Sequence, residues 1–217
     1  MSIQAVIFDM DGVILDSEPQ IIEAKQQVLR QYGIEQPESY HYKFMGMSFQ
    51  AIWQQIQVEL DLPVSWQELL NDYFVKYKLL IKQSAQHPIV GSIELVSRLQ
   101  QAGYKLALAS SSPIDDIQRT LNDFKITDCF DAIISGYTLA HPKPAPDIFQ
   151  IAIRQLQVTP ANSVVVEDSM NGIKAGLAAG ARVIGYNDPR YYSQRKVDDI
   201  QVVTEMKQIQ EFLLPKE

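Results

Sequence analysis

The feature that most constrains the fold of this chain is the stretch at residues 5–12, Ala-Val-Ile-Phe-Asp-Met-Asp-Gly. Four successive apolar residues, partly β-branched, predict a strand that is buried on both faces. Side chains two residues apart in an extended chain point the same way, so Asp9 and Asp11 are expected to face one place just beyond the strand. Gly12 then allows the backbone to leave the strand at a sharp angle.

Two carboxylates held this close repel each other, so the stretch predicts a cation beside them, either a metal ion or a lysine. A plain strand followed by an Asp-Gly turn would leave the same local pattern, because both residue types are common in turns. The rest of the chain has to decide between these two interpretations.

The composition is that of an ordinary soluble protein of 217 residues, enough for one large domain or one domain with a sizeable insert. The net charge of −7 argues against a nucleic-acid partner, which usually binds a basic surface. Cys129 is the only cysteine, so no internal disulfide can form. No apolar run is long enough to cross a bilayer and no signal peptide is evident, so we expect no membrane association and a cytoplasmic location. The acidic surface and small size favour a monomer.

Residues 16–86 contain amphipathic helical patterns but no convincing buried strand. Helices are expected near residues 18–32, 49–60 and 66–84, with Ser17 as the N-cap of the first. This stretch is predicted to be a helical domain inserted after the first strand, with aromatic side chains in its core. The aromatic residues assigned to that core are Phe44, Phe49, Trp53 and Trp66.

From Pro88 onward, predicted strands and helices alternate. The expected strands are residues 105–109, 131–135, 163–166, 182–185 and 200–203, and the expected helices are residues 92–102, 113–124, 146–156 and 171–179. Such alternation predicts an α/β domain with a doubly wound parallel sheet, built from residues 1–15 and 87–217.

Sheets of this kind bind ligands beyond the carboxyl ends of their strands, at the point where the strand order reverses. The polar residues that follow the predicted strands are Asp9, Asp11, Ser110, Ser111, Lys143, Glu167 and Asp168. Carboxylate ligands without His or Cys favour Mg²⁺ over zinc. A lysine and a strand-end serine suit an oxyanion, so the set predicts phosphoryl transfer.

The two aspartates of the first strand fit two chemical roles. A carboxylate can attack phosphorus to form an aspartyl-phosphate, and a second carboxyl can protonate the leaving alcohol and later activate water. We therefore predict Asp9 as the nucleophile and Asp11 as the general acid and base. A non-catalytic receiver-like module also has an aspartate pocket at a strand end, but the large insert and the Glu167–Asp168 pair count against it.

These residues resemble the haloacid dehalogenase superfamily of phosphohydrolases. The segments that are similar to its four motifs, in the same order, are residues 9–13, Ser110, residues 143–149 and residues 165–172. The insert of residues 16–86 resembles the helical cap of the family. The subgroup with the closest resemblance is the β-phosphoglucomutase-like and sugar-phosphatase branch.

The resemblance implies Mg²⁺ held by the Asp9 side chain, the Asp11 backbone carbonyl and Asp168, with Glu167 assisting. It also implies that Ser110 and Lys143 hold the transferring phosphoryl group, while the cap closes over the core and selects the substrate. The remaining predicted substrate contacts are Ser111, Gly46 and Glu18, and Glu18 is equally well interpreted as a helix-start charge.

Two positions depart from the mutase pattern. Ile21 stands where the mutase has a cap histidine, and Phe49 stands where it has a cap arginine that binds a second phosphate. The resemblance thus implies a Mg²⁺-dependent phosphatase acting on a small phosphorylated metabolite such as a sugar phosphate. A β-phosphoglucomutase-type phosphosugar mutase is the alternative.

Overall fold

The computed structural model describes residues 2–45, 47–191 and 200–214. The chain divides into two compact units. The core unit comprises Met1–Asp16 and His87–Glu217, and the helical unit comprises Ser17–Gln86. Gly46, a predicted substrate contact, lies outside the described residues.

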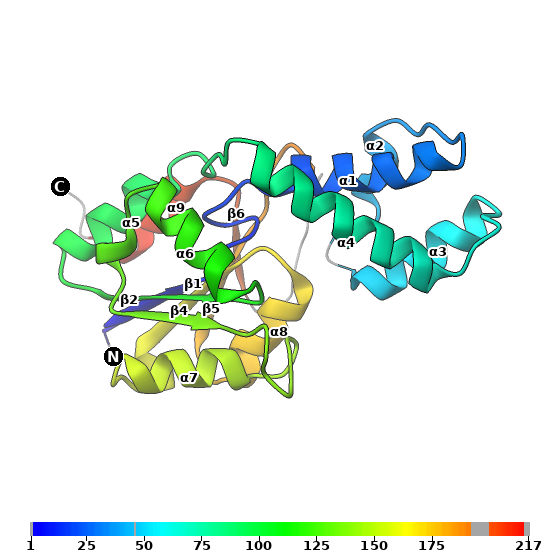
Figure 1. Ribbon diagram of the computed structural model, residues 1–217. Coiled ribbons are helices and arrows are strands. Elements are labelled where there is room, and N and C mark those ends of the chain that lie inside the picture. The colour runs from blue at the N-terminus through cyan, green and yellow to red at the C-terminus, as the bar shows by residue number, and fades with distance from the viewer. Residues whose placement is uncertain (1, 46, 192–199, 215–217) are drawn as a thin grey trace. The chain divides into compact units, whose positions relative to one another are not determined.

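The core unit contains a parallel sheet of six strands in its described residues, ordered β3-β2-β1-β4-β5-β6 (Figure 1). The strands are β1 (Ala5–Phe8), β2 (Lys105–Ser110), β3 (Ala132–Ser135), β4 (Ser163–Glu167), β5 (Arg182–Tyr186) and β6 (Gln201–Val203). The predicted doubly wound sheet is confirmed. Its order reverses between β1 and β4, so the carboxyl ends of these two neighbours mark the place where such sheets bind ligands.

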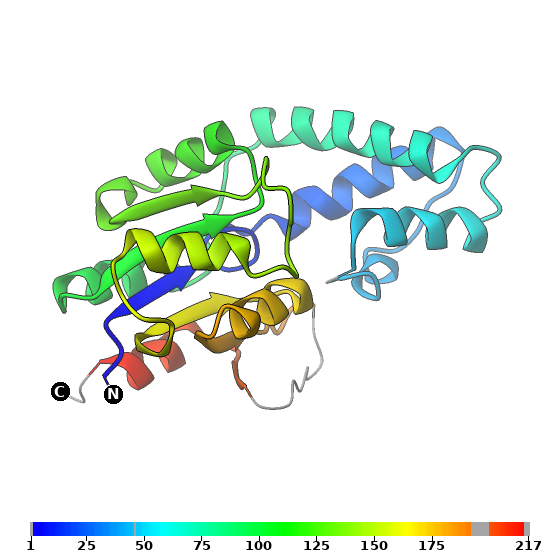
Figure 2. The same ribbon diagram turned by 90° about the horizontal axis from the view of Figure 1, so that it is seen from below.

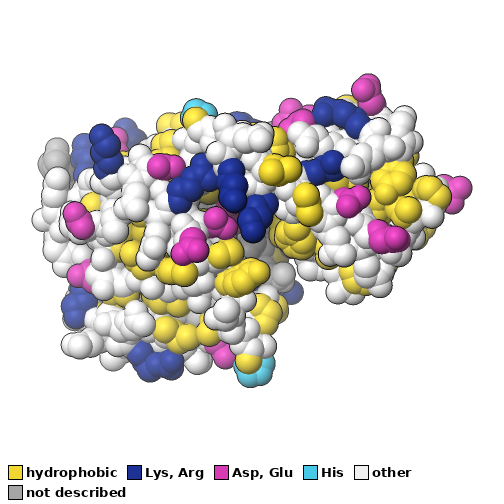
Figure 3. Space-filling model, in the orientation of Figure 1, with side chains coloured by type: hydrophobic (Ala, Val, Ile, Leu, Met, Phe, Trp, Pro, Cys, Tyr) yellow, Lys and Arg dark blue, Asp and Glu magenta, His cyan; other side chains and the backbone are white. Residues whose placement is uncertain are grey.

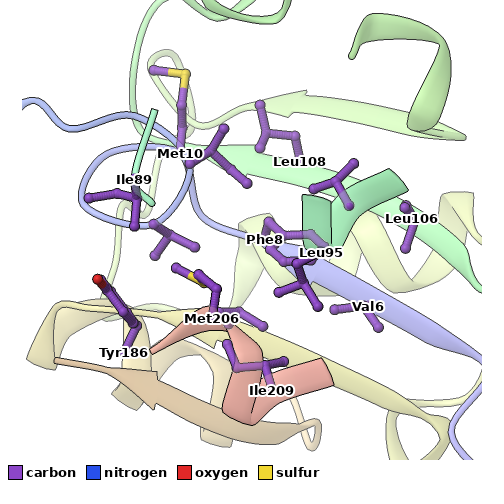
Figure 4. Packing of buried hydrophobic residues seen from close by; sticks show 14 of the residues in the cluster. Val6, Phe8, Met10, Ile89, Leu95, Leu106, Leu108, Tyr186, Met206 and Ile209 are labelled. Atoms are coloured by element: carbon purple, nitrogen blue, oxygen red, sulfur yellow. The ribbon is translucent and has the colours of Figure 1, made fainter. Parts of the chain in front are cut away.

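Helices cover both faces of this sheet (Figures 1 and 2). The helices are α5 (Ser92–Gln101), α6 (Ile114–Asp123) and α9 (Met206–Leu213) on one face, and α7 (Asp147–Gln155) and α8 (Met170–Ala178) on the other. Alternate residues of β1 enter opposite cores: Val6 and Phe8 pack with α5, α6 and α9, and Ile7 packs with α7 and α8. Figure 4 shows Phe8 among Leu95 and other side chains of the first core. The apolar run is continuous because neither face of β1 meets water.

The helical unit consists of α1 (Glu18–Gln31), α2 (Ser39–Tyr42), α3 (Phe49–Glu59) and α4 (Trp66–Gln83). α4 packs against both α1 and α3, and Phe44, Trp53 and Tyr73 are fully buried between the helices. The prediction of core aromatics is therefore confirmed for Phe44 and Trp53. Trp66 is half-buried and packs against the edge of the cluster.

The core prediction is wrong for Phe49, which is 37% exposed. It is the first residue of α3, and its ring lies 5.1 Å from that of Tyr73 and 5.5 Å from that of Phe74 at the rim of the unit. Apolar side chains thus reach the surface of the helical unit, as the yellow side chains in Figure 3 show.

Three details of the helices differ from the prediction. Ser17 does not cap α1 within the described structure, because its backbone is already helical (φ −93°, ψ −15°) rather than extended. α2 and α9 were not predicted, and neither were the short 3₁₀ helices Thr127–Cys129 and Pro160–Asn162. Among the described residues no helix has both the length and the apolarity to cross a bilayer.

Candidate active site

Three carboxylates meet where the strand order reverses. Asp9 follows β1 directly, and its N–H donates to the Val166 carbonyl of β4 (3.0 Å). Glu167 ends β4 and Asp168 follows it, so the parallel pairing of β1 with β4 brings all three together. One oxygen from each of Asp9, Glu167 and Asp168 lies within 4.8 Å of the others. Adjacent strands thus create an acidic cluster from residues 158 positions apart in sequence (9 and 167).

Lys143 supplies the cation that the repulsion between carboxylates predicted. Its Nζ donates to Asp9 Oδ1 (2.6 Å), to Glu167 Oε1 (2.9 Å) and to the Ala109 carbonyl at the end of β2 (3.2 Å). The same ammonium lies 4.8 Å from the centre of the Phe149 ring. With three acceptors for its three N–H groups, a side chain only 8% exposed is held in one position.

The electrostatics of this buried group are strongly coupled. Burial raises the pKa of Asp9 to about 7, and the charges of Glu167 and Asp11 add to the increase while Lys143 opposes it. Although burial has the opposite effect, the charges of Asp9 and Glu167 raise the pKa of Lys143. The lysine therefore stays protonated, and a further cation near Asp9 would favour the ionised carboxylate.

The side chains fit a magnesium ion. When all are ionised, three carboxylates and one ammonium leave a net charge of −2, which a divalent ion would neutralise. Two glycines leave room for the carboxylates. A Cβ on Gly12 would lie 2.2 Å from Asp168 Oδ2, and a Cβ on Gly172 would lie 1.7 Å from Glu167 Oε1. The all-oxygen donor set suits Mg²⁺.

The protein binds both carboxylate oxygens of Glu167. Oε1 accepts from Lys143, and Oε2 accepts from the backbone N–H of Ser169 (2.6 Å). The hydroxyl of Ser169 in turn caps α8 by accepting from the N–H of Gly172 (3.0 Å). The first turn of α8 therefore fixes Glu167, which suits the assisting role expected of it.

The carboxylate of Asp11 contacts the segment that follows β2. Oδ2 of Asp11 accepts a hydrogen bond from Ser112 Oγ (2.9 Å), and its side chain is not part of the three-carboxylate cluster found in the described residues. Ser110 is 1% exposed at the end of β2, and its Oγ accepts from the N–H of Ser112 (3.1 Å). Ser111 is exposed. The contact between Ser112 and Asp11 was not predicted, although the three successive serines drew attention to this strand end.

A second unpredicted contact joins the end of β5 to the segment after β1. Arg190 donates to Asp188 through several of its nitrogens and to Asp16 Oδ2 through Nη1 (2.7 Å). The ion pair fixes the last residue of the first core segment. Glu18, a predicted substrate contact, is half-buried in the first turn of α1 in the helical unit, and its role stays a prediction.

Comparison with known proteins identifies the family. The model of the haloacid dehalogenase-like hydrolase family matches residues 6–186. The chain belongs to this family. The resemblance inferred from the four motifs is therefore confirmed, and the matched span of this hydrolase contains the carboxyl ends of β1 to β5.

Relatives of this hydrolase include both phosphatases and a mutase. Hexitol phosphatase B of Escherichia coli (strain K12) is 31% identical over 205 residues, covering 87% of this chain and 88% of the relative. Beta-phosphoglucomutase of Bacillus subtilis (strain 168) is 31% identical over 188 residues, covering 84% and 82%. A solved HAD family hydrolase from Deinococcus radiodurans R1, with bound phosphate and sodium, is 26% identical and superposes with a TM-score of 0.81 over 97% of this chain and 95% of that one.

Proposed function

We propose that this protein is a Mg²⁺-dependent phosphatase that hydrolyses small phosphomonoesters, in particular sugar phosphates, through an aspartyl-phosphate intermediate. The observation that carries the proposal is the acidic cluster of Asp9, Glu167 and Asp168 around the buried ammonium of Lys143. A relative named as a hexitol phosphatase supports the class of substrate, and a structural neighbour with bound phosphate supports the class of ligand.

In the proposed reaction, Asp9 attacks phosphorus while Asp11 gives a proton to the departing alcohol. An Asp9 O–P bond forms and the ester P–O bond breaks. Asp11 then takes a proton from water, the water oxygen bonds to phosphorus, and cleavage of the Asp9 O–P bond releases inorganic phosphate. Lys143 and Ser110 hold the transferring group, since an ammonium and a hydroxyl can both donate to its oxygens.

Magnesium, when bound, would supply positive charge against the phosphoryl oxygens. The residues proposed to hold it are the Asp9 and Asp168 side chains and the Asp11 backbone carbonyl, with Glu167 assisting. The helical unit is proposed to act as a cap that excludes water and selects the substrate. Its predicted contacts Glu18 and Gly46, like the monomeric state and the cytoplasmic location, stay predictions.

A panel of phosphomonoesters tests the proposal by phosphate release with and without Mg²⁺. Asp9→Asn should lower kcat/KM by on the order of 10³-fold or more, because an amide cannot act as the nucleophile. Asp123→Asn, which neutralises an exposed carboxylate of α6, is the matched control and should leave the rate unchanged. Near-normal activity of Asp9→Asn would exclude the nucleophile. Absence of Mg²⁺-stimulated release across the panel would favour the receiver-like module.

A phosphosugar mutase is the second candidate, favoured by the 31% identity to a β-phosphoglucomutase. Ile21 and Phe49 count against it, because neither apolar side chain can bind a second phosphate. The two candidates separate when β-glucose 1-phosphate is supplied with a bisphosphate activator. A mutase produces glucose 6-phosphate, whereas the proposed phosphatase releases inorganic phosphate.

A further inference from the structure

Ser112 is fixed more firmly than a loop residue ordinarily is. Its backbone N–H donates to Ser110 Oγ (3.1 Å) at the end of β2, and its carbonyl accepts from Ser135 Oγ (2.7 Å) at the end of β3. Both anchors are side chains on neighbouring paired strands, which are the rigid part of the core unit. The position of the Ser112 hydroxyl is therefore set by the sheet.

That hydroxyl lies against the carboxylate of Asp11. Ser112 Oγ is 2.9 Å from Asp11 Oδ2, an ordinary distance for a hydroxyl that donates to a carboxylate. A serine hydroxyl can also accept a hydrogen bond, so the contact can persist when Asp11 carries a proton. An aspartate side chain otherwise has several rotamers, and a fixed partner favours one of them.

We propose that Ser112 is a positioning residue for Asp11, holding the carboxyl group where it can pass its proton to the departing alcohol. The inference rests on the proposed function and extends it to a residue that binds neither the phosphoryl group nor the ion in that proposal. The chain of contacts runs from Ser135 at the end of β3, through Ser112, to Asp11.

This role can be tested by comparing esters whose leaving groups differ in their need for a proton. An alkoxide needs a proton as it departs, whereas p-nitrophenolate is stable without one. Ser112→Ala should lower kcat/KM about tenfold for an alkyl phosphate identified in the panel, and leave kcat/KM for p-nitrophenyl phosphate within about twofold. The ratio kcat/KM is the right quantity, since it excludes the later hydrolysis of the aspartyl-phosphate, which is common to both substrates.

Three further variants complete the experiment. Ser112→Thr keeps the hydroxyl and should restore the rate on the alkyl phosphate. Ser135→Ala removes only the anchor of the Ser112 carbonyl, and should give the same dependence on leaving group with a loss of about two- to threefold. Ser97→Ala is the matched control, because Ser97 Oγ donates to the Ile93 carbonyl within α5, and it should change neither rate.

The outcomes separate the inference from the function on which it depends. If the wild-type protein cleaves both esters and Ser112→Ala loses activity equally on both, or on neither, the role of Ser112 is overturned and the phosphatase proposal stands. Wild-type protein that cleaves neither ester overturns both. A loss confined to the alkyl phosphate and reversed by Ser112→Thr supports the inference, because a merely structural defect would affect both esters.

Discussion

Each unit of this protein buries a lysine, and the two lysines differ in their surroundings. Lys143 of the core unit donates to two carboxylates and a carbonyl, and the charges of Asp9 and Glu167 raise its pKa. Lys25 of the helical unit is 2% exposed on α1. Burial lowers the pKa of Lys25, with Glu18 opposing the shift.

His41, whose pKa the charge of Lys25 affects, also lies in an environment that disfavours a positive charge. His41 is fully buried, and neither ring nitrogen has a hydrogen-bond partner among the residues that the structure describes. Burial lowers the pKa of His41 to about 4, and the charges of Lys25 and Lys43 add to the decrease. Burial alone disfavours a charge, and at Lys143 two carboxylates at hydrogen-bond distance reverse that effect. The core unit provides these carboxylates at the site where a phosphoryl group would need a cation.

The sharpest test of the contrast is Lys143→Met, which keeps the side-chain length and removes the charge. We expect a loss of activity on the order of 10³-fold and a decrease of about 3–5 kcal/mol in the free energy of unfolding without Mg²⁺, because two buried carboxylates lose their cation. Phosphate release and urea unfolding measure the two effects. An unchanged free energy of unfolding would show that solvent compensates Asp9 and Glu167 for the loss of the lysine charge.

The pH dependence of the free energy of unfolding should reveal the lowered pKa of His41. Its folded pKa of about 4 lies below the ordinary histidine value of 6.5, so the unfolded chain binds the proton more tightly between these values. The contribution of His41 should therefore lower the free energy of unfolding by about 3 kcal/mol as the pH decreases from about 6.5 to about 4, opposite in sign to the contribution of Asp9 over this range. His41→Phe should remove that part of the decrease. His87→Phe, at an exposed histidine, is the control and should keep it.

Magnesium should stabilise the protein, and more strongly at pH 8 than at pH 5.5. The pKa of Asp9 is about 7 in the folded protein, against an ordinary value of 3.8. Ionising this buried group therefore costs stability as the pH rises between those values, and a bound cation offsets the cost. At a concentration 100-fold above its Kd, the ion should contribute about 2.7 kcal/mol. Thermal unfolding with Mg²⁺ alone measures it.

Two controls belong to the magnesium experiment. Asp168→Asn should abolish the stabilisation because it removes one of the three clustered carboxylates. Asp123→Asn should leave it unchanged, since that carboxylate lies on α6. Equal stabilisation at both pH values would mean that Asp9 does not bind the ion.

The smallest effect is expected for Lys25→Met. A buried amine replaced by an apolar side chain of similar size should leave stability unchanged or raise it by about 1 kcal/mol. The same substitution that damages the core unit would thus be harmless in the helical unit. A decrease in the free energy of unfolding comparable to that of Lys143→Met would show that the two lysines have equivalent surroundings.

The features that sequence predicted well depend on local pattern. Buried strands such as β1 and β4 appear as continuous apolar runs, and the parallel order of such strands brings Asp9 and Glu167 together without knowledge of any side-chain conformation. The α9 helix also had a local indication, the capping box formed by Glu205 and Gln208, but its shortness hid it.

The features that were missed depend on contacts between distant segments. Ser112 and Asp11 are 101 residues apart, and Arg190 and Asp16 are 174 apart. The hydrophobic periodicity of the sequence does not show which side-chain rotamers allow such distant residues to form hydrogen bonds.

The glycines of α8 have a consequence for anyone who engineers this enzyme for heat resistance. Alanine in place of a mid-helix glycine ordinarily adds up to about 1 kcal/mol, so Gly172 and Gly176 would be early choices for a design based on helix propensity. A methyl group at Gly172 would collide with the carboxylate of Glu167, and one at Gly176 would come within 2.8 Å of Val183. Alanine at Gly172 would therefore displace a side chain of the acidic cluster and alanine at Gly176 would crowd β5, so heat-resistant variants should be sought on other helices.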